Sequence, residues 1–472
     1  MKHSGRAVVV GSGPNGLAAA IVLEQAGMQV EVFEAQPQPG GAARTMELTL
    51  PGFHHDFGSA VHPMAAGSPF FSGLPLREHG LQWIHFPAPV AHPLDDGTAV
   101  VLERDLDDAA RALGEDGRAW DTLVRPLVER WTEIAPELLG PVLHIPRHPF
   151  LLAKFGISAV QPAQSLADRL FRSARTKALF AGLAAHSMLA LDEPLTGAFG
   201  IMLAVTAHAV GWPIPRGGSQ SIANALITHL HQLGGTVTAS APVHSLSSLG
   251  DCKIAMCDIT PKQLLQIAGE RFTSGFKRSL AQYRYGPGAF KVDYALSAPI
   301  PWKAVDCARA ATVHVGGTLE EVARSEHDVR HGVAPERPFL LAVQPTLVDP
   351  ARAPAGKHIA WVYCHVPNGS DVDMLPRIEA QLERFAPGFR DCVLARNILR
   401  PADLERMDAN LIGGDIGGGE SSWRQFFLRP TRHLYATDTK DIYICSSSTP
   451  PGGGVHGMCG YNAATMALQR LI

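Results

Sequence analysis

The apolar and polar positions at the beginning of the chain predict a strand, a helix and a second strand in close succession. Arg6 to Val10 is a β-rich apolar run, and a glycine-rich turn follows it directly. Asn15 to Gln25 has the small and apolar residues of a closely packed helix, with Gly27 as its stop. Val30 to Phe33 forms the second strand, after which Glu34 follows. We therefore expect a β–α–β unit here.

The turn between the first strand and the helix carries the Gly-x-Gly-x-x-Gly spacing of dinucleotide-binding proteins. Gly11 permits the tight turn, Gly13 lets the backbone approach a pyrophosphate, and Gly16 allows close packing of helix on strand. The helix N-terminus offers N–H groups and partial positive charge to the phosphates. Glu34 lies near the roughly 20-residue offset at which an acid binds a ribose 2′-hydroxyl, and it would repel the 2′-phosphate of NADP. The turn alone leaves FAD and NAD open.

Later stretches repeat strand and helix patterns of the same kind. After Pro215 and a glycine pair, apolar residues at helical spacing predict a helix, and a β-rich run then continues to Val243. Residues 252–269 have the pattern of a strand followed by a helix. Residues 442–445 form a buried-strand pattern, and a glycine loop then leads into a terminal helix from Val455 onward. A helix N-terminus placed after such a loop can stabilise an electron-rich ligand.

The long stretches between these units have different patterns. Residues 76–212 are rich in Leu, Ala, Trp and Phe at helical spacing, which predicts a largely helical segment. Residues 271–429 contain the runs FKVDYALSAPIPW, PFLLAVQPTL and HIAWVYCHV, which predict strands of an antiparallel sheet.

Composition limits the classes of protein to which the chain can belong. Hydrophobic residues make up 46% and charged residues 18% of its 472 residues, which fits a globular protein of about two to four domains. The formal net charge of −3 gives no electrostatic basis for binding nucleic acid. The 7 cysteines are scattered without a Cys-x-x-Cys pair, which is typical of buried thiols in a reducing compartment. The 21 histidines show no metal-ligand spacing, so no metal is expected.

The most apolar later region, residues 177–212, is interrupted by Asp192, Glu193 and Pro194. Each half is shorter than the roughly 20 residues that a spanning helix needs, so we expect two buried helices and no transmembrane span. A surface that contacts a membrane peripherally, or that lines a substrate cavity, stays open as an alternative. The turn at Gly11 leaves no room for a secretory signal before it, and a cytoplasmic location is expected.

Several segments resemble the flavin amine oxidase and phytoene desaturase superfamily. PQPGGAART resembles the glycine-pair segment that binds FAD there, with Arg44 as a donor to the diphosphate, although Ala42 stands where the superfamily often has Arg. FHHDFGSAVHP resembles the stretch that returns toward the flavin ring. FKVDYALSAPIPW, GGDIGGGE and the C-terminal region resemble the subgroup named pyridine nucleotide-disulfide oxidoreductase domain-containing proteins, close to the phytoene dehydrogenase-like branch. Because no Cys-x-x-Cys pair is present, no redox-active disulfide is expected.

The resemblance implies an α/β fold, with a Rossmann-type, glutathione-reductase-like FAD domain and an interleaved α+β substrate domain built on an antiparallel sheet. The implied FAD domain is discontinuous, with residues 1–75, 213–270 and 430–472, and the substrate domain takes residues 76–212 and 271–429. FAD is expected to bind non-covalently. The contacts expected from the motif and the resemblance together are Gly11, Ser12, Gly13, Pro14, Asn15, Gly16, Glu34, Ala35, Gly41, Ala42, Arg44, Gly58, Ser59, Ala60, Val61, Val243, Gly454, Val455 and Met458.

Flavin chemistry needs no nucleophile, metal or triad from the protein, so the lack of such a motif argues little against an enzyme. His62 and His456 lie beside the predicted flavin segments and are candidates for moving a proton. The leading hypothesis is an FAD-dependent oxidoreductase that desaturates, saturates or isomerises a carbon–carbon bond of an apolar or amphipathic substrate. A flavin amine oxidase, a flavin-binding scaffold with a partner-binding role, and an NAD-linked dehydrogenase are the alternatives. The sequence identifies neither the electron acceptor nor the oligomeric state.

Two further observations bear on the amine oxidase alternative. That reaction calls for an aromatic cage beside the flavin, and the 7 Trp and 7 Tyr residues form no obvious pair in the sequence. Cys459 could form a covalent flavin thioether, but its loop lacks the Ser-Gly-Gly-Cys arrangement of the amine oxidases that do so, and such a bond is not expected.

Overall fold

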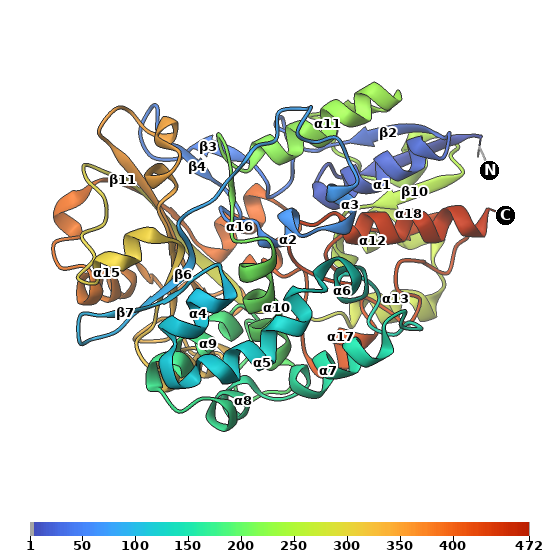
Figure 1. Cartoon of the computed structure of the whole chain (residues 1–472). Coiled ribbons are helices and arrows are strands. Elements are labelled where there is room, and N and C mark those ends of the chain that lie inside the picture. Colours follow the sequence, from blue (N-terminus) through green and yellow to red (C-terminus); the bar gives the residue numbers. More distant parts are fainter. Residues whose placement is uncertain (1–3, 472) are drawn as a thin grey trace.

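A five-stranded parallel sheet forms one end of the molecule (Figure 1, right). The computed structural model describes residues 4–471 of the 472-residue chain. The strand order β16-β10-β1-β2-β9 places segments from both ends and from the middle of the chain side by side. The strands are β1 (Arg6–Val10), β2 (Gln29–Phe33), β9 (Thr236–Thr238), β10 (Ile254–Cys257) and β16 (Ile442–Ile444). All pair in parallel, as the β–α–β pattern predicts.

Helices cover both faces of this sheet, which explains why its strands are nearly continuous in apolar residues. Val9 and Val32 pack with one group of helices, α1 (Pro14–Gln25), α11 (Gln220–Leu233) and α18 (Met458–Arg470). Val8 and Val10 point the other way, toward α12 (Pro261–Ala268) and α13 (Ser274–Ala281). The β-rich run that was expected to reach Val243 is a strand only as far as Thr238, because Ser240 has a φ of +53°, which an extended strand does not allow.

Helices α1 and α18 cross at an unusually short distance. A Cβ atom built on Gly460 would lie 1.8 Å from the backbone oxygen of Asn15. This contact brings the N-terminal ends of the two helices together, beside the turn at Gly11–Gly16. It therefore ties the last helix of the chain to the first.

We expect Gly460→Ala to destabilise the fold, because the added methyl group must push the two helix backbones apart. The expected loss is about 1–3 kcal/mol in the free energy of unfolding. The matched control is Gly156→Ala, at a helical glycine where an added Cβ would have nothing within 4 Å. Urea unfolding followed by circular dichroism measures both, and equal stability of the two variants would contradict the expectation.

A seven-stranded sheet lies at the other end of the molecule, in the order β15-β11-β14-β13-β12-β6-β7. Its strands are β6 (Ala88–Pro93), β7 (Ala99–Leu102), β11 (Gly288–Leu296), β12 (Ala310–Val315), β13 (Leu340–Val343), β14 (His358–Val366) and β15 (Val393–Leu399). The predicted antiparallel sheet is mixed in one place, since β12 and β6 pair in parallel. Strands β6 and β12 are far apart in the chain, so no hairpin fixes the direction of one relative to the other.

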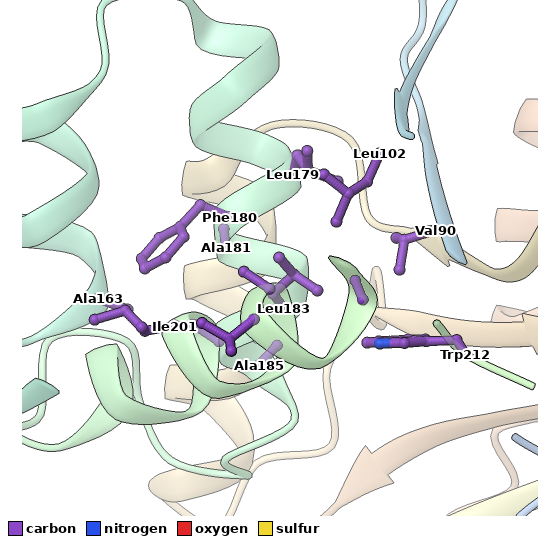
Figure 2. Close-up of a cluster of buried hydrophobic side chains, with 14 of the residues drawn as sticks. Val90, Leu102, Ala163, Leu179, Phe180, Ala181, Leu183, Ala185, Ile201 and Trp212 are labelled. Atoms are coloured by element: carbon purple, nitrogen blue, oxygen red, sulfur yellow. The ribbon is translucent and has the colours of Figure 1, made fainter. Parts of the chain in front are cut away.

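Helices also flank the second sheet. Phe290 and Val292 of β11 lie on the same face of the sheet and pack in a core with α15 (Leu375–Phe385) through Ile378 and Leu382. A helical layer on the other side contains α4 (Leu106–Ala112), α5 (Gly117–Val128), α6 (Trp131–Leu138), α7 (Pro149–Ala159), α8 (Ala163–Leu170), α9 (Ala174–Ala185) and α10 (Thr196–Ala209). Figure 2 shows Phe180 and Leu183 of α9 packed near Ile201 of α10, with Val90 and Trp212 at the edge of this cluster.

The remaining elements are short, apart from α14. They are β3 (Thr45–Glu47), β4 (His54–Asp56), β5 (Trp83–Ile84), β8 (Ile214–Pro215), α2 (Pro63–Ala66), α3 (Pro69–Ser72), α14 (Leu319–Arg330), α16 (Pro401–Met407) and α17 (Trp423–Phe427). None of the helices between residues 4 and 471 is both long enough and apolar enough to cross a membrane.

The two sheets draw on different parts of the chain. The strands of the five-stranded sheet lie within residues 1–75, 213–270 and 430–472, and those of the seven-stranded sheet within 76–212 and 271–429. The chain therefore passes repeatedly between the two ends of the molecule. Side chains from both ends can meet where they adjoin.

Candidate functional site

A cavity of about 870 Å³ extends from the five-stranded sheet to the seven-stranded sheet. Its wall includes Val10 and Phe33, at the carboxyl ends of β1 and β2, and Lys291 and Trp361 of the second sheet. Ligands of open α/β sheets bind beyond the carboxyl ends of the strands. The volume lies in the upper part of the roughly 300–1,000 Å³ range of small-molecule and cofactor sites.

Most residues expected to contact a cofactor line this cavity. They are Gly11, Ser12, Gly13, Pro14, Asn15, Glu34, Ala35, Gly41, Ala42, Arg44, Gly58, Ser59, Ala60, Val61, Val243, Gly454 and Val455, together with His62 and His456. Gly16 and Met458 are not part of the wall, and their expected contacts with a cofactor stay predictions. The Gly16 N–H donates to Asp258 Oδ2 at 2.8 Å, and the Met458 N–H donates to His456 Nδ1 at 3.0 Å. The glycine loop before α18 therefore faces the cavity, while the first N–H of that helix is already bound.

Glu34 is buried beside the turn, at the end of β2. Its Oε2 accepts hydrogen bonds from the Ser12 N–H at 3.0 Å and the Ser12 hydroxyl at 2.6 Å, and Oε1 accepts from the Gln36 N–H at 2.8 Å. A carboxylate has about four lone-pair sites. The acid thus holds the turn to the strand end and retains limited capacity for a ribose hydroxyl.

Arg44 makes hydrogen bonds within the protein that its sequence context does not indicate. Its Nε donates to the Gly41 carbonyl at 2.7 Å and its Nη2 to the Met407 carbonyl at 2.9 Å. The guanidinium carbon also lies 4.8 Å from the centre of the Phe57 ring. Burial lowers the pKa of Arg44, with Asp408 and Glu34 acting against this shift. Arg44 therefore holds the glycine-pair segment in place, and its expected role as a donor to the diphosphate stays a prediction.

The backbone segments around the cavity approach each other closely at the glycines. A Cβ atom on Gly41, whose φ is +56°, would lie 3.0 Å from Gly13 Cα, and one on Gly58 would lie 2.5 Å from the Ala42 oxygen. Three segments of the first sixty or so residues thus form one continuous wall without side chains to fill it. Such a surface leaves backbone groups accessible to a phosphate-bearing ligand.

Apart from Glu420, whose carboxylate forms ion pairs with Arg284 and Arg330, three residues of the cavity wall have buried polar atoms without a hydrogen-bond partner among the described residues. These atoms are Asn15 Oδ1, Trp212 Nε1 and His456 Nε2. Buried polar groups are nearly always paired in native proteins, and an unmade bond is expensive. One acceptor and two donors on one cavity wall fit a ligand with both kinds of group, as a dinucleotide has.

The two candidate histidines are buried and neutral. Burial lowers the pKa of His62 to about 4 and that of His456 to about 4. His62 Nε2 lies 2.8 Å from Ser219 Oγ, which itself donates to the Ser59 carbonyl at 2.6 Å. His456 Nδ1 accepts a backbone N–H, so its Nε2 carries the proton. His456 is therefore placed as a neutral donor rather than as a general acid.

A buried ion pair on β11 is a feature that the sequence analysis did not identify. Lys291 Nζ lies 2.6 Å from Asp293 Oδ1 and 2.5 Å from Oδ2, and both side chains are almost completely buried. Burial lowers the pKa of Lys291, and the charge of Asp293 opposes this shift. The signal was present in FKVDYAL, because two charged residues at i and i+2 of an apolar strand share one face.

Lys291 lies where the two parts of the cavity meet. Its Nζ is 6.0 Å from the centre of the Trp361 ring on the neighbouring strand β14. Trp361 in turn donates through Nε1 to the Gly58 carbonyl at 2.8 Å. This bond joins the seven-stranded sheet to the segment that follows the glycine pair.

The aromatic pair that the sequence did not reveal is also on this sheet. Trp361 and Tyr363 both line the cavity, with ring centres 5.0 Å apart and planes at 70°. The two residues are two positions apart on β14, so both side chains lie on the face of the sheet that also carries Lys291. The expectation of no paired aromatics is therefore wrong, because residues two apart on a strand lie on the same face.

The rest of the cavity is apolar and extends into the helical layer. Met188, Phe199, Met202 and Leu203 line it from α10 and the loop before it, and Leu152 and Phe155 from α7. The expected pair of buried helices in the 177–212 region is observed as α9 and α10, and the second of them forms part of this wall.

Neither Cys459 nor the residue types that can bind a metal give the site a further chemical function. Cys459 is buried with Sγ 3.5 Å from the carbonyl oxygens of Thr449 and Gly452, and burial raises its pKa to about 11. A thiol with a raised pKa is a poor nucleophile. Within residues 4–471, no group of three or more His, Cys, Asp or Glu side chains is arranged to hold a metal ion.

Comparison with known proteins agrees with this geometry. Residues 9–71 match the NAD(P)-binding Rossmann-like domain. The pyridine nucleotide-disulfide oxidoreductase domain-containing protein 2 of Rattus norvegicus is 25% identical, over 98% of this chain and 93% of that protein. The phytoene desaturase (lycopene-forming) of Pseudescherichia vulneris is 22% identical, over 98% of this chain and 99% of that protein. These matches confirm the expected relationship to the pyridine nucleotide-disulfide oxidoreductase domain-containing proteins and to the phytoene desaturases.

A solved structure of a putrescine oxidase variant has a similar fold. It superposes with a TM-score of 0.61 at 16% identity and covers 100% of this chain and 99% of its own. At this identity the likeness concerns the fold alone. It confirms the predicted α/β architecture of a Rossmann-type unit with an interleaved second sheet.

Proposed function

We propose that this chain, a relative of pyridine nucleotide-disulfide oxidoreductase domain-containing protein 2 and of the phytoene desaturases, is an oxidoreductase that binds FAD non-covalently. Its substrate is apolar or amphipathic, and the reaction changes a carbon–carbon bond by desaturation, saturation or isomerisation. The observation that carries the proposal is the single cavity that joins the glycine turn to an apolar chamber.

The residues of the cavity wall fit FAD. The turn at Gly11–Gly13 and the N-terminus of α1 would hold the diphosphate, with Glu34 nearest to the adenosine ribose. The 58–61 segment, the 454–456 loop and the unpartnered atoms of Asn15 and His456 would hold the flavin part. Cys459 is not part of the cavity wall and its Sγ is directed at the Thr449 and Gly452 carbonyls, which supports non-covalent binding. When bound, FAD would supply a two-electron acceptor.

Asp258 makes FAD binding dependent on pH. Burial raises the pKa of its carboxyl group to about 8, with Asp408 and Glu34 adding to the shift and the Gly16 N–H opposing it. The carboxyl group is thus neutral at pH 7 and becomes an anion above pH 8, where it repels a diphosphate at the α1 N-terminus. We expect the affinity for FAD to fall by up to about tenfold per pH unit above this value.

Asp258→Asn should remove this dependence, because asparagine has the same shape and does not ionise. Fluorescence titration of the apoprotein with FAD below and above pH 8 measures it. If the affinity for FAD fell with pH equally in the wild type and in Asp258→Asn, the assignment of this pH dependence to Asp258 would be contradicted. The raised pKa also predicts that the wild type loses folding stability as pH rises toward this value, and that the Asn variant does not.

The substrate part of the cavity favours an apolar compound. Its sheet face presents Leu341, Val343 and the aromatic pair, and α7 and α10 add further apolar side chains. Oxidation of a substrate releases a proton, which needs an acceptor in the cavity. The Lys291–Asp293 pair can take it, because the pair, as an ammonium ion and a carboxylate, holds one proton fewer than its two groups can carry.

A flavin amine oxidase is the second candidate, and the Trp361–Tyr363 pair is the observation that favours it. Aromatic faces attract ammonium groups. Lys291, however, lies on the same face and is paired with Asp293, so its charge would repel a cationic substrate. We therefore place amine oxidation second.

Anaerobic reduction of the bound flavin tests this assignment. The purified protein is mixed with apolar polyenes and, separately, with a panel of aliphatic and aromatic amines, and the absorbance of oxidised flavin is followed. Bleaching by the polyenes, with none by the amines, is the expected result. Bleaching by amines with hydrogen peroxide release in air would establish the second candidate. Flavin that no substrate reduces would instead point to a scaffold that binds a partner.

A further inference from the structure

The segment of residues 141–160 exposes large apolar side chains to solvent. Ile145 is 93% exposed and Phe150 is 91% exposed, and Leu143, Ile157 and Val160 are exposed as well. The segment comprises the connection after α6 and the helix α7, which Figure 1 shows at the outer edge of the helical layer. Contiguous exposed apolar surface of this kind marks a binding site.

The opposite side of the same segment forms part of the cavity wall. Val142 precedes α7 and lines the cavity, as do Leu152 and Phe155 within the helix. The helix is therefore apolar on its inner and its outer side. A helix that is apolar all around is normally buried. The outer side of α7 thus lacks a covering partner among the described residues, while only the thickness of the helix separates it from the substrate chamber.

The charged residues of this segment indicate the chemistry of the partner. Arg147 and Lys154 are exposed, and the segment contains no acidic residue. The nearby Glu137 is turned inward, where it accepts the His148 N–H at 2.8 Å and binds His144 Nε2 at 3.2 Å. Exposed apolar side chains among basic ones are typical of surfaces that enter the interface of an anionic bilayer.

A second copy of the chain fits this surface less well. In a symmetric dimer the patch would face itself. Arg147 and Lys154 of both copies would then meet without a carboxylate from the segment to neutralise them. Like charges in an interface are unfavourable, whereas lipid phosphates provide the missing negative charge.

The helix α17 supports the same conclusion from another part of the chain. Phe426 lines the cavity, while Trp423 and Leu428, on either side of it, are 54% and 48% exposed. Both segments therefore combine a share of the cavity wall with apolar side chains in solvent. Tryptophan is enriched at the level of lipid headgroups.

We propose that the membrane-docking surface, defined as residues 141–160, binds the interface of a bilayer that contains anionic phospholipids. Ile145 and Phe150 enter the acyl boundary, and Arg147 and Lys154 face the phosphates. Docking places α7 between the bilayer and the cavity, so an apolar substrate can pass from lipid to the chamber beside this helix. The docking itself does not depend on the reaction proposed above.

Co-sedimentation of the full-length protein with vesicles tests the proposal. The vesicles contain phosphatidylcholine alone, or equal parts of phosphatidylcholine and phosphatidylglycerol. We expect binding to the anionic vesicles that weakens with added salt. Ile145→Ser/Phe150→Ser should reduce partitioning roughly 10- to 100-fold. Arg147→Glu/Lys154→Glu should reduce it by roughly 30-fold or more.

The matched control is Val305→Ser/Val333→Ser, which changes two exposed apolar residues elsewhere, 78% and 54% exposed. It should bind vesicles like the wild type. Flavin content and circular dichroism of each variant establish that it is folded, independently of any activity. The proposal is overturned if the wild type binds neither kind of vesicle, or if the Ile145/Phe150 variant binds as tightly as the control. It is also overturned if sedimentation equilibrium shows a dimer that this variant dissociates, since a second copy would then cover the surface.

Discussion

We expect Gly13→Val to yield a folded protein that no longer retains FAD. The φ of Gly13 is −62°, which an L-residue adopts without strain, so the backbone tolerates the change. A Cβ atom there would lie 2.6 Å from Asp258 Oδ2, and a valine side chain would occupy the space above the turn. The diphosphate can then no longer approach the backbone. We expect the dissociation constant of FAD to rise at least about 1,000-fold, which corresponds to about 4 kcal/mol.

Gly269→Val is the matched control for this substitution. It changes a glycine outside the cavity wall, where an added Cβ would have nothing within 4 Å. Flavin released from each purified variant by heat is quantified against protein concentration, and circular dichroism reports the fold. If the Gly13 variant retained stoichiometric flavin, the turn would not be the diphosphate site.

The second large effect concerns the buried ion pair. Lys291→Met alone would leave Asp293 buried without its partner, at a cost of about 3–5 kcal/mol in stability. Lys291→Met/Asp293→Leu removes both charges, and we expect its stability to lie close to that of the wild type. Turnover should still fall by roughly 100-fold or more, because the cavity has lost its proton acceptor. The flavin content should be unchanged.

The double variant separates a proton-transfer role from a structural one. Lys177→Met provides the control, since Lys177 forms a surface pair with Asp168 at 2.8 Å. Such pairs contribute about 0–1 kcal/mol, so neither stability nor turnover should change. The measurements are urea unfolding and the rate of anaerobic flavin reduction. A double variant that is stable and reduces its flavin at the wild-type rate would exclude Lys291 from the reaction.

The sequence predicted the first sheet well because its signals are local. The strand Arg6–Val10, the turn and the helix that begins at Pro14 follow from residues that are neighbours in the chain. The same holds for the runs that became β11 and β14. The direction of β6 against β12 was not predictable in this way, because it depends on how distant segments return to one sheet.

The site was predicted in part, for a related reason. Glycine-rich segments indicate that the backbone approaches a ligand, and most of these segments line the cavity. The role of Arg44 depends on the carbonyl of Met407, which belongs to a distant helix and could not be inferred from the motif. Asp258 gives no motif signal, although a carboxyl group directly after an apolar strand was a clue. The exposure of Phe150 became visible only once α7 had been placed at the surface.

The central claim is that three separate stretches of the chain build one FAD site. It is tested most directly by the absorption spectrum and flavin content of the purified full-length protein. The account predicts a yellow protein with one FAD per chain, which denaturation releases without covalent residue. A folded protein that is colourless and does not take up FAD on titration would contradict it.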